Sequence, residues 1–152
     1  MKLAEALVLR ADLKKRLEQL RARLNASALV QEGEAPPEDP QGLLSELEVM
    51  IREFERLVIA INRTNSSVTI AGIGTLTEAL AKRDALDLKF SLLSGLLEAA
   101  SNRVNRYSRT EIKLVSTVDV ATLRKQLDEI ARLRRDLDSS VQGTNWTTDL
   151  LE

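Results

Sequence analysis

The chain has 152 residues, of which 43% are hydrophobic and 30% are charged, a balance that suits one soluble domain. Its 22 basic and 23 acidic residues nearly cancel, so no overall field draws it to nucleic acid or to an anionic membrane. The sequence has no histidine and no cysteine, which excludes imidazole and thiolate metal sites, cysteine and serine–histidine nucleophiles, and disulfides. These absences exclude many function classes and identify none.

The sequence contains no segment typical of secretion or of membrane insertion. Glu5, Arg10 and Asp12 interrupt the apolar run that a signal peptide needs after its basic start. The longest stretch without charge, residues 64–77, is shorter than the roughly 20 apolar residues of a spanning helix. We therefore expect a cytoplasmic protein that does not act in a membrane.

Residues 2–30 are predicted to form a long helix with a coiled-coil-like stripe. Apolar residues recur at alternating intervals of four and three residues, the spacing that places side chains on one helical face. One arginine interrupts the stripe, which consists of Leu3, Ala6, Arg10, Leu13, Leu17, Leu20 and Leu24. Residues 32–40 follow as an acidic linker that holds all three prolines of the chain, and we expect an exposed loop there.

Residues 41–66 are predicted to form a second helix with the widest apolar face of the chain. Its main stripe is Leu44, Leu47, Ile51, Phe54, Val58, Ile61 and Asn65. A flanking row adds Leu43, Met50 and Leu57. A helix with so wide an apolar face is expected to contact more than one neighbour.

Two short segments are predicted to be extended. Residues 67–75 alternate apolar and small polar side chains and then contain two glycines, which favours a short hairpin or a structured loop. Residues 111–118 also alternate, so they could form a strand that pairs with residues 68–70.

Two further helices complete the prediction. Residues 75–107 begin with a Thr75–Glu78 capping box and carry a stripe through Ala79, Arg83, Leu86, Phe90, Leu93, Leu97, Ala100, Val104 and Tyr107. Residues 119–142 carry a stripe through Val120, Leu123, Leu127, Ile130, Arg134, Leu137 and Val141. Thr117 or Asp119 can cap the fourth helix, and Gly143 suits the position just after its end.

Together these elements predict a mainly α fold, with all residues 1–152 in one elongated antiparallel bundle of coiled-coil-like helices. A helix of about 30 residues spans about 45 Å, whereas a compact domain of this length has a radius of gyration of about 15 Å. A monomer would also expose apolar patches larger than soluble proteins usually tolerate. We therefore expect a homo-oligomer.

Four polar residues interrupt the apolar stripes, namely Arg10, Asn65, Arg83 and Arg134. Such residues pair with carboxylates on a facing helix and fix register and assembly, or they form a buried site for an anion or other ligand. The first interpretation is favoured.

A second polar set gathers near the predicted helix–loop junctions and forms a candidate polar site: Asn62, Arg63, Asn65, Thr75, Arg83, Asp84, Arg109, Glu111 and Lys113. Their amides, hydroxyls, guanidinium groups and carboxylates would suffice for a small polar pocket, but they are equally typical of a loop-capping network, which is favoured. No catalytic residue, cofactor or metal site is predicted. Gly72 and Gly74 lack the third glycine of a dinucleotide loop, and the carboxylate pairs lack the histidine of a helical di-iron site.

Several segments together resemble one bacterial family of small helical proteins labelled septicolysin. They are residues 1–24, INRTN at 61–65, GTLTEALAKRDAL at 74–86, SRTEIKLVSTVDVATLRKQLD at 108–128 and NWTTDL at 145–150. The resemblance implies a helical fold and a homo-oligomer, with a hexamer as the specific form, and it carries no assigned activity or functional residues. The label implies a cytolysin, which no feature of the residues supports.

Three functions follow as hypotheses. The favoured one is a non-enzymatic scaffold or interaction module that associates with itself. The second is a ligand-binding or catalytic protein that uses the candidate polar site. The third is membrane lysis, which rests on the family label alone. Nucleic acid is an unlikely partner because the arginine clusters at 103–109 and 132–135 lack aromatic platforms.

Overall fold

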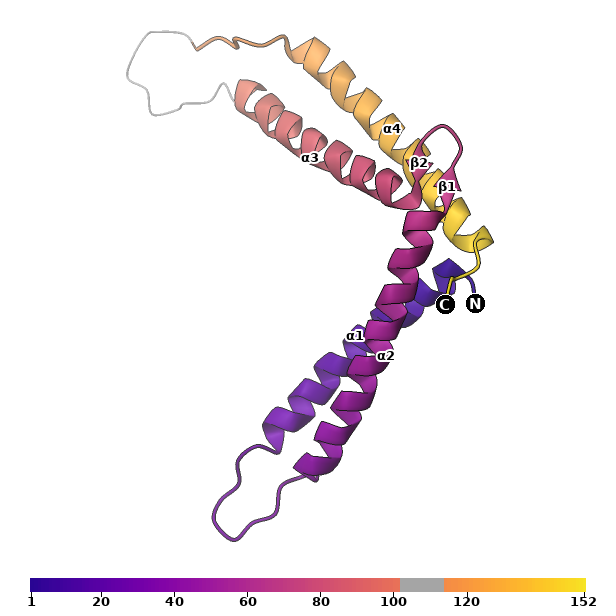
Figure 1. The fold of residues 1–152 in the computed structure, drawn as a ribbon. Coiled ribbons are helices and arrows are strands. Elements are labelled where there is room, and N and C mark those ends of the chain that lie inside the picture. The colour runs from indigo at the N-terminus through magenta and orange to yellow at the C-terminus, as the bar shows by residue number, and fades with distance from the viewer. Residues whose placement is uncertain (102–113) are drawn as a thin grey trace. The chain divides into compact units, whose positions relative to one another are not determined.

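A computed structural model describes residues 1–101 and 114–152, which contain four helices and one two-stranded antiparallel sheet (Figure 1). The elements are α1 (Leu3–Ala26), α2 (Pro40–Ser67), β1 (Thr69–Ile70), β2 (Gly74–Thr75), α3 (Leu76–Ser101) and α4 (Val120–Thr147). The prediction of a mainly α fold with a short hairpin is confirmed. The predicted stripe members Val104 and Tyr107 lie outside the described residues.

The chain divides into two compact units. The first unit comprises Met1–Val68 and Gly143–Glu152, and the second comprises Thr69–Gln142. Each unit is described by itself below, and the expectation of one domain stays a prediction.

The first unit is built on a hairpin of α1 and α2, which lie side by side (Figure 1). Its core contains Leu20, Leu43 and Met50, against which leucines 17, 24 and 47 pack. The C-terminal half of the predicted α1 stripe belongs to this core, and at its start Leu3, Ala6 and Leu13 are also buried, with almost no exposed surface. Here the sequence pattern identified the buried face correctly.

Both predicted apolar rows of α2 contribute to the buried face, since Ile61 of the main stripe is fully buried, but the flanking row is buried more completely. The structure buries Leu43, Met50 and Leu57, the row expected to flank the main stripe. Two members of the main stripe, Leu44 and Ile51, are 44% and 45% exposed. The reason is that a single neighbouring helix covers only one side of α2, so part of its wide apolar face stays uncovered.

Two boundaries of the first hairpin differ from the prediction. Helix α1 was expected to reach residue 30, but it ends at Ala26. Ser27 follows the last helical residue, and its N–H donates to the carbonyl of Arg23 at 3.1 Å. Helix α2 begins at Pro40, which was assigned to the linker. The Asp39 carboxylate accepts the N–H groups of Gln41 and Gly42 at 3.3 and 3.0 Å, and proline is favourable in the first helical turn, where its missing donor costs nothing.

The two ends of the described chain meet in the first unit. The N–H of Leu3 donates to the carbonyl of Thr148, and the N–H of Leu150 donates to the carbonyl of Met1, both at 2.9 Å. We call this pairing of residues 1–3 with 148–150 the terminal clamp. It holds the C-terminal segment beside the start of α1.

Thr64 attaches the C-terminal segment to α2. Its side chain is fully buried, and its hydroxyl donates to the carbonyl of Ala60 at 2.8 Å while accepting the N–H of Leu151 at 2.9 Å. Because both hydrogen-bonding functions of the hydroxyl are used, the buried oxygen carries no desolvation penalty. Sequence reasoning placed Thr64 next to the candidate polar site without assigning it a role.

The second unit begins with the β1–β2 hairpin, in which Thr69 pairs with Thr75 and Ile70 with Gly74. Gly72 and Gly74 adopt φ values of +75° and +121°, which residues with a side chain rarely adopt, so the glycines permit the turn. The proposed strand pairing between residues 68–70 and 111–118 is wrong for the described part. Residues 114–118 form no strand, β1 pairs with β2 instead, and residues 111–113 lie outside the described residues.

Helix α4 begins at one of its two predicted caps but ends later than predicted. Asp119 caps α4 by accepting the N–H groups of Ala121 and Thr122 at 3.0 and 3.3 Å. The helix was expected to end at residue 142, but it continues through Gly143 to Thr147. Gly143 lacks the positive φ of a residue that follows a helix, so it is an ordinary helical residue.

The two helices of the second unit differ in how much they bury. The predicted stripe of α4 is buried at Leu123, Leu127, Ile130, Leu137 and Val141. In α3 only Leu76 and Ala79 are buried. Most apolar side chains of α3 therefore remain partly or fully exposed.

We predict that Thr64→Val lowers the free energy of unfolding by about 1–2 kcal/mol. Valine keeps the shape of the side chain but leaves the N–H of Leu151 without its acceptor. Urea denaturation followed by circular dichroism measures the change. Ser66→Ala is the matched control, because its exposed hydroxyl donates only to the carbonyl of Asn62 in the same helix. Equal stability of the two variants would contradict a stabilising role for the Thr64 hydroxyl.

Candidate functional site

The residues of the candidate polar site fall into two local groups. Asn62, Arg63 and Asn65 lie near the C-terminal end of α2 in the first unit. Thr75, Arg83 and Asp84 lie in β2 and the first turns of α3 in the second unit. The remaining three predicted members, Arg109, Glu111 and Lys113, lie outside the described residues.

In the first group, Arg63 forms a hydrogen bond to the C-terminal segment. Its guanidinium donates from Nη1 to the backbone oxygen of Glu152 at 2.8 Å. Asn62 is exposed and Asn65 is half-buried. The group therefore helps to hold the C-terminal segment on α2, next to the buried Thr64.

In the second group, Thr75 forms the predicted capping box with Glu78. The backbone N–H of Thr75 donates to the Glu78 carboxylate at 2.6 Å, and the Thr75 hydroxyl accepts the N–H of Glu78 at 3.2 Å. The Thr75 hydroxyl also donates to the Glu78 carboxylate at 3.0 Å. The backbone N–H of Thr75 first, and then this hydroxyl, lower the pKa of Glu78. The polar atoms of this pair are thus engaged in starting α3.

The arginines that interrupt the apolar stripes of α3 and α4 pair with carboxylates across the two helices. The Arg134 guanidinium hydrogen-bonds to Asp87, and this bond, followed by charge attraction, raises the pKa of Arg134. Arg83 lies 4.0 Å from Asp138 and 3.4 Å from its neighbour Asp84. These contacts fit the interpretation that polar stripe residues set helix register. All of them are substantially exposed, so each contributes little to stability.

The remaining stripe-interrupting residues show no comparable pairing. Arg10 is half-buried on α1 and makes no ion pair within the part of the chain that the structure describes.

Among the described residues there is also no cluster of three or more acidic side chains able to hold a metal ion. No helix in residues 1–101 or 114–152 combines the length and apolarity needed to cross a membrane.

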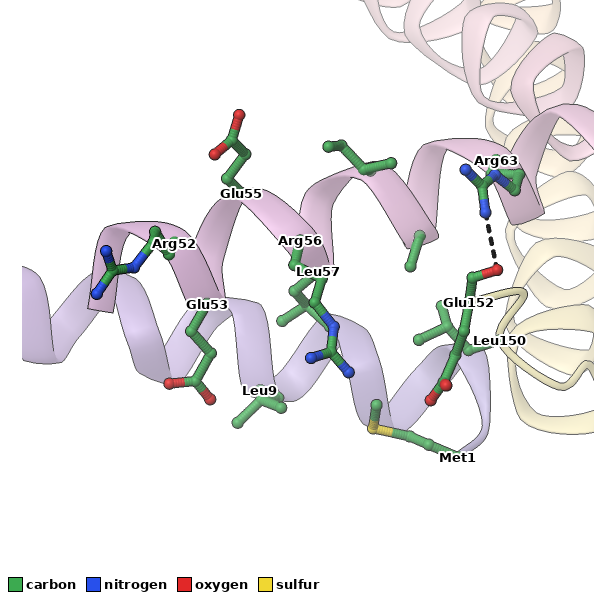
Figure 2. Close-up of a pocket in the computed structure, with 12 residues that line it drawn as sticks. Met1, Leu9, Arg52, Glu53, Glu55, Arg56, Leu57, Arg63, Leu150 and Glu152 are labelled. Carbon is green, nitrogen blue, oxygen red and sulfur yellow. Dashed lines mark hydrogen bonds between the residues drawn. The ribbon is translucent and has the colours of Figure 1, made fainter. Parts of the chain in front are cut away.

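The first unit has a groove of about 970 Å³ along α2 (Figure 2). Its apolar lining consists of Met1, Leu9, Leu57, Ile59, Ala60 and Leu150. Its charged lining consists of Arg52, Glu53, Glu55, Arg56, Arg63 and Glu152. The groove thus combines six apolar residues with three guanidinium groups and three carboxylates, so it offers both apolar and charged contacts to a ligand.

Sequence reasoning missed most of this groove. Of its lining residues only Arg63 belonged to the candidate polar site. The available signal was the spacing of Arg52, Arg56 and Arg63, which places three arginines along one side of α2. The apolar lining could not be found in this way, because Met1 and Leu150 reach it only through the terminal clamp.

Comparison with known proteins finds similarity over nearly the whole chain. Residues 10–150 match a family described as a family of unknown function, DUF6847. The chain is also similar to a functionally unknown conserved protein from Corynebacterium diphtheriae, known from a crystal structure. The two are 43% identical over 99% of each chain, with a TM-score of 0.92. No curated protein matches the sequence.

We predict that the terminal clamp weakens when the pH falls below the ordinary pKa of aspartate. The Lys2 ammonium lies 2.8 Å from the Asp149 carboxylate and lowers the pKa of Asp149 by hydrogen bonding and charge attraction. Because the pKa of Asp149 is lower in the folded than in the unfolded state, the Lys2–Asp149 pair stabilises the clamp fully above the unfolded-state pKa of about 4. This stabilisation is lost as the pH falls through the folded-state pKa of Asp149.

Hydrogen exchange at the amides of Leu3 and Leu150 measures the effect between pH 5 and 2. We expect Asp149→Asn to give less protection than the wild type at pH 5, and the two proteins to converge at the acid end. A constant difference across this range would show that Lys2 and Asp149 do not control the clamp.

Proposed function

The chain belongs to the family of unknown function DUF6847, and we propose that it is a cytoplasmic, homo-oligomeric helical protein that serves as a scaffold or interaction module. Its activity would lie in the surfaces that it presents, and it would need no catalytic residue. The observation that carries this proposal is the amount of apolar surface left uncovered on regular helical faces.

That uncovered surface is found in both units. In the first unit, Leu44, Ile51 and Ile59 of α2 are 44%, 45% and 51% exposed. In the second unit, Leu88 and Leu92 of α3 are 62% and 66% exposed. Because these residues recur at helical spacing, they form extended faces and not isolated side chains. Faces of this kind usually mark an interaction surface.

The engagement of the polar residues supports a structural role as well. Thr75 and Glu78 begin a helix, Arg134 joins α4 to α3, and Arg63 holds the C-terminal segment. In each case the contact has a local structural purpose. No described arrangement combines a nucleophile, a base and a site for a reacting atom.

A second candidate function, binding of an amphipathic anion, is favoured by the groove along α2. Arg56 lies there among Met1, Leu57 and Leu150, so a ligand could bury an apolar part while its anionic group meets the guanidinium. This arrangement uses Arg63 of the candidate polar site but not its other members.

The groove predicts binding of the anionic apolar dye 1-anilino-8-naphthalenesulfonate. We expect Arg56→Glu to weaken dye binding at least threefold, because it replaces an attractive charge by a repulsive one. Fluorescence titration gives the dissociation constant. The matched control is Arg124→Glu, at an exposed position on α4 away from the groove lining. Equal effects of the two substitutions would rule out specific binding in the groove.

Self-association predicts a solution mass that is a multiple of the 16.9 kDa chain at micromolar concentration. The physical reason is that association removes the exposed faces of α2 and α3 from water, at about 25 cal/mol per Å² of apolar surface. Size-exclusion chromatography with light scattering, repeated over a hundredfold range of concentration, measures this mass. A stable monomer over that range would overturn the proposal.

A further inference from the structure

Helix α3 carries a second apolar row that the second unit leaves uncovered. The row begins at Ala81, and its members follow at alternating intervals of four and three residues. We call it the outer row; it consists of Ala81, Ala85, Leu88, Leu92, Gly95 and Ala99. All six residues are exposed. By contrast, the stripe predicted from the sequence is buried at Ala79 and half-buried at Leu86, Leu93 and Leu97.

We propose that the outer row packs against the same row of a second copy, forming a parallel coiled coil of two α3 helices; the inference rests on the self-association proposed above. The row keeps the heptad spacing that holds an apolar seam toward a partner helix. From Ala81 to Ala99 it extends along about 27 Å of helix and contains no charged residue. Its small residues, Ala85 and Gly95, allow the two backbones to approach closely on either side of the central leucines.

The charges beside the row are complementary to those of a second parallel copy. Asp84 directly precedes Ala85, and Lys89 directly follows Leu88. In a parallel pair, these two positions of neighbouring heptads face each other across the seam. Asp84 of each copy therefore meets Lys89 of the other, and the contact occurs twice.

Both charged groups are available for this contact. The Asp84 side chain is 72% exposed, and its only ion pair in the described residues is a 3.4 Å contact with the adjacent Arg83. Lys89 is exposed and forms no ion pair within residues 1–101 and 114–152. The exposed pair thus has no stronger competing partner within its own unit.

The antiparallel alternative brings like charges together. In that arrangement Leu88 would lie opposite Leu92 of the second copy. Lys89 would then face Lys89, and Asp84 would face Glu98. Because like charges across a seam are unfavourable, the sequence favours the parallel orientation over the antiparallel one.

The centre of the contact is expected at the two leucines. Near the C-terminal end of the row, Ala99 also lines a hollow of about 320 Å³ together with residues 114–118. Leu88 and Leu92 do not line this hollow. They are therefore the best positions for testing the contact with a second copy.

The absence of cysteine makes the orientation directly testable by cross-linking. Leu88→Cys and Leu92→Cys, each alone, should form a covalent dimer under mild oxidation, because a parallel seam places each position opposite itself. A mixture of the two variants, one of them carrying a size tag, should give little mixed dimer. Leu29→Cys is the control, at a position 90% exposed outside the helices, and should not cross-link above the background. Efficient mixed dimers without self-dimers would overturn the parallel orientation.

Charge reversal tests the same contact without oxidation. Asp84→Lys or Lys89→Glu alone should raise the dissociation constant about three- to tenfold at low salt, and the double variant should recover most of the affinity. Leu88→Glu combined with Leu92→Glu should abolish this interface and lower the assembly mass. Because all four side chains are exposed, circular dichroism is expected to show unchanged helix content.

The outcomes separate this inference from the proposed function. A monomeric wild type overturns both. A wild-type oligomer whose mass is unchanged by the paired leucine substitutions, and whose cysteine variants do not cross-link, overturns the α3 contact and leaves self-association standing. Single charge reversals without effect, or a double variant without recovery, overturn the Asp84–Lys89 pairing.

Discussion

The structure depends on one geometric constraint, which is that each unit is built mainly from two long helices. A helix with a single neighbour can bury only one side of its surface. In the first unit α1 covers the row of α2 that includes Leu43 and Met50, and it leaves Leu44 and Ile51 exposed. The remaining apolar surface is not an error of packing. It follows from having more apolar rows than neighbouring helices, and it makes the surface of this protein the natural place to look for its function.

Polar contacts supplement the apolar packing within each unit. The Arg134–Asp87 contact joins α4 to α3, and the buried Thr64 hydroxyl accepts the N–H of Leu151 in the C-terminal segment. The arginine pair is exposed and adds little stability, whereas the Thr64 hydroxyl is buried and fully hydrogen-bonded.

The sequence was sufficient for features that depend on local spacing. The approximate helix positions and the Thr75–Glu78 capping box follow from local spacing and were predicted, and Asp119 was one of the two predicted caps of α4. Which of the two apolar rows of α2 is buried more completely was not predicted, because burial depends on which side the neighbouring helix approaches. The helical state of Gly143 was missed for a related reason, since glycine permits a helix end without requiring one.

The candidate site was harder to predict than the fold, because its parts come together only through long-range contacts. Asn62, Arg63 and Asn65 were grouped with Thr75, Arg83 and Asp84 on the assumption of adjacent helix ends. The structure gives each group its own local contacts, and that grouping stays a prediction. The groove was invisible to sequence reasoning, since it joins α2 to residues nearly 90 positions away, as the Arg63–Glu152 contact illustrates.

The terminal clamp has a consequence for the order in which the protein forms during synthesis. Helices α1 and α2 are neighbours in the sequence, so they can pair as soon as both have left the ribosome. Next to the clamp, the Lys2 ammonium donates to the carbonyl of Thr147, which lies 145 positions away in the sequence. The first unit therefore starts to form early but is completed only after residues 148–150 have been made. Until then the N–H of Leu3 lacks its acceptor, the carbonyl of Thr148, so the nascent chain exposes a backbone group that the finished protein pairs.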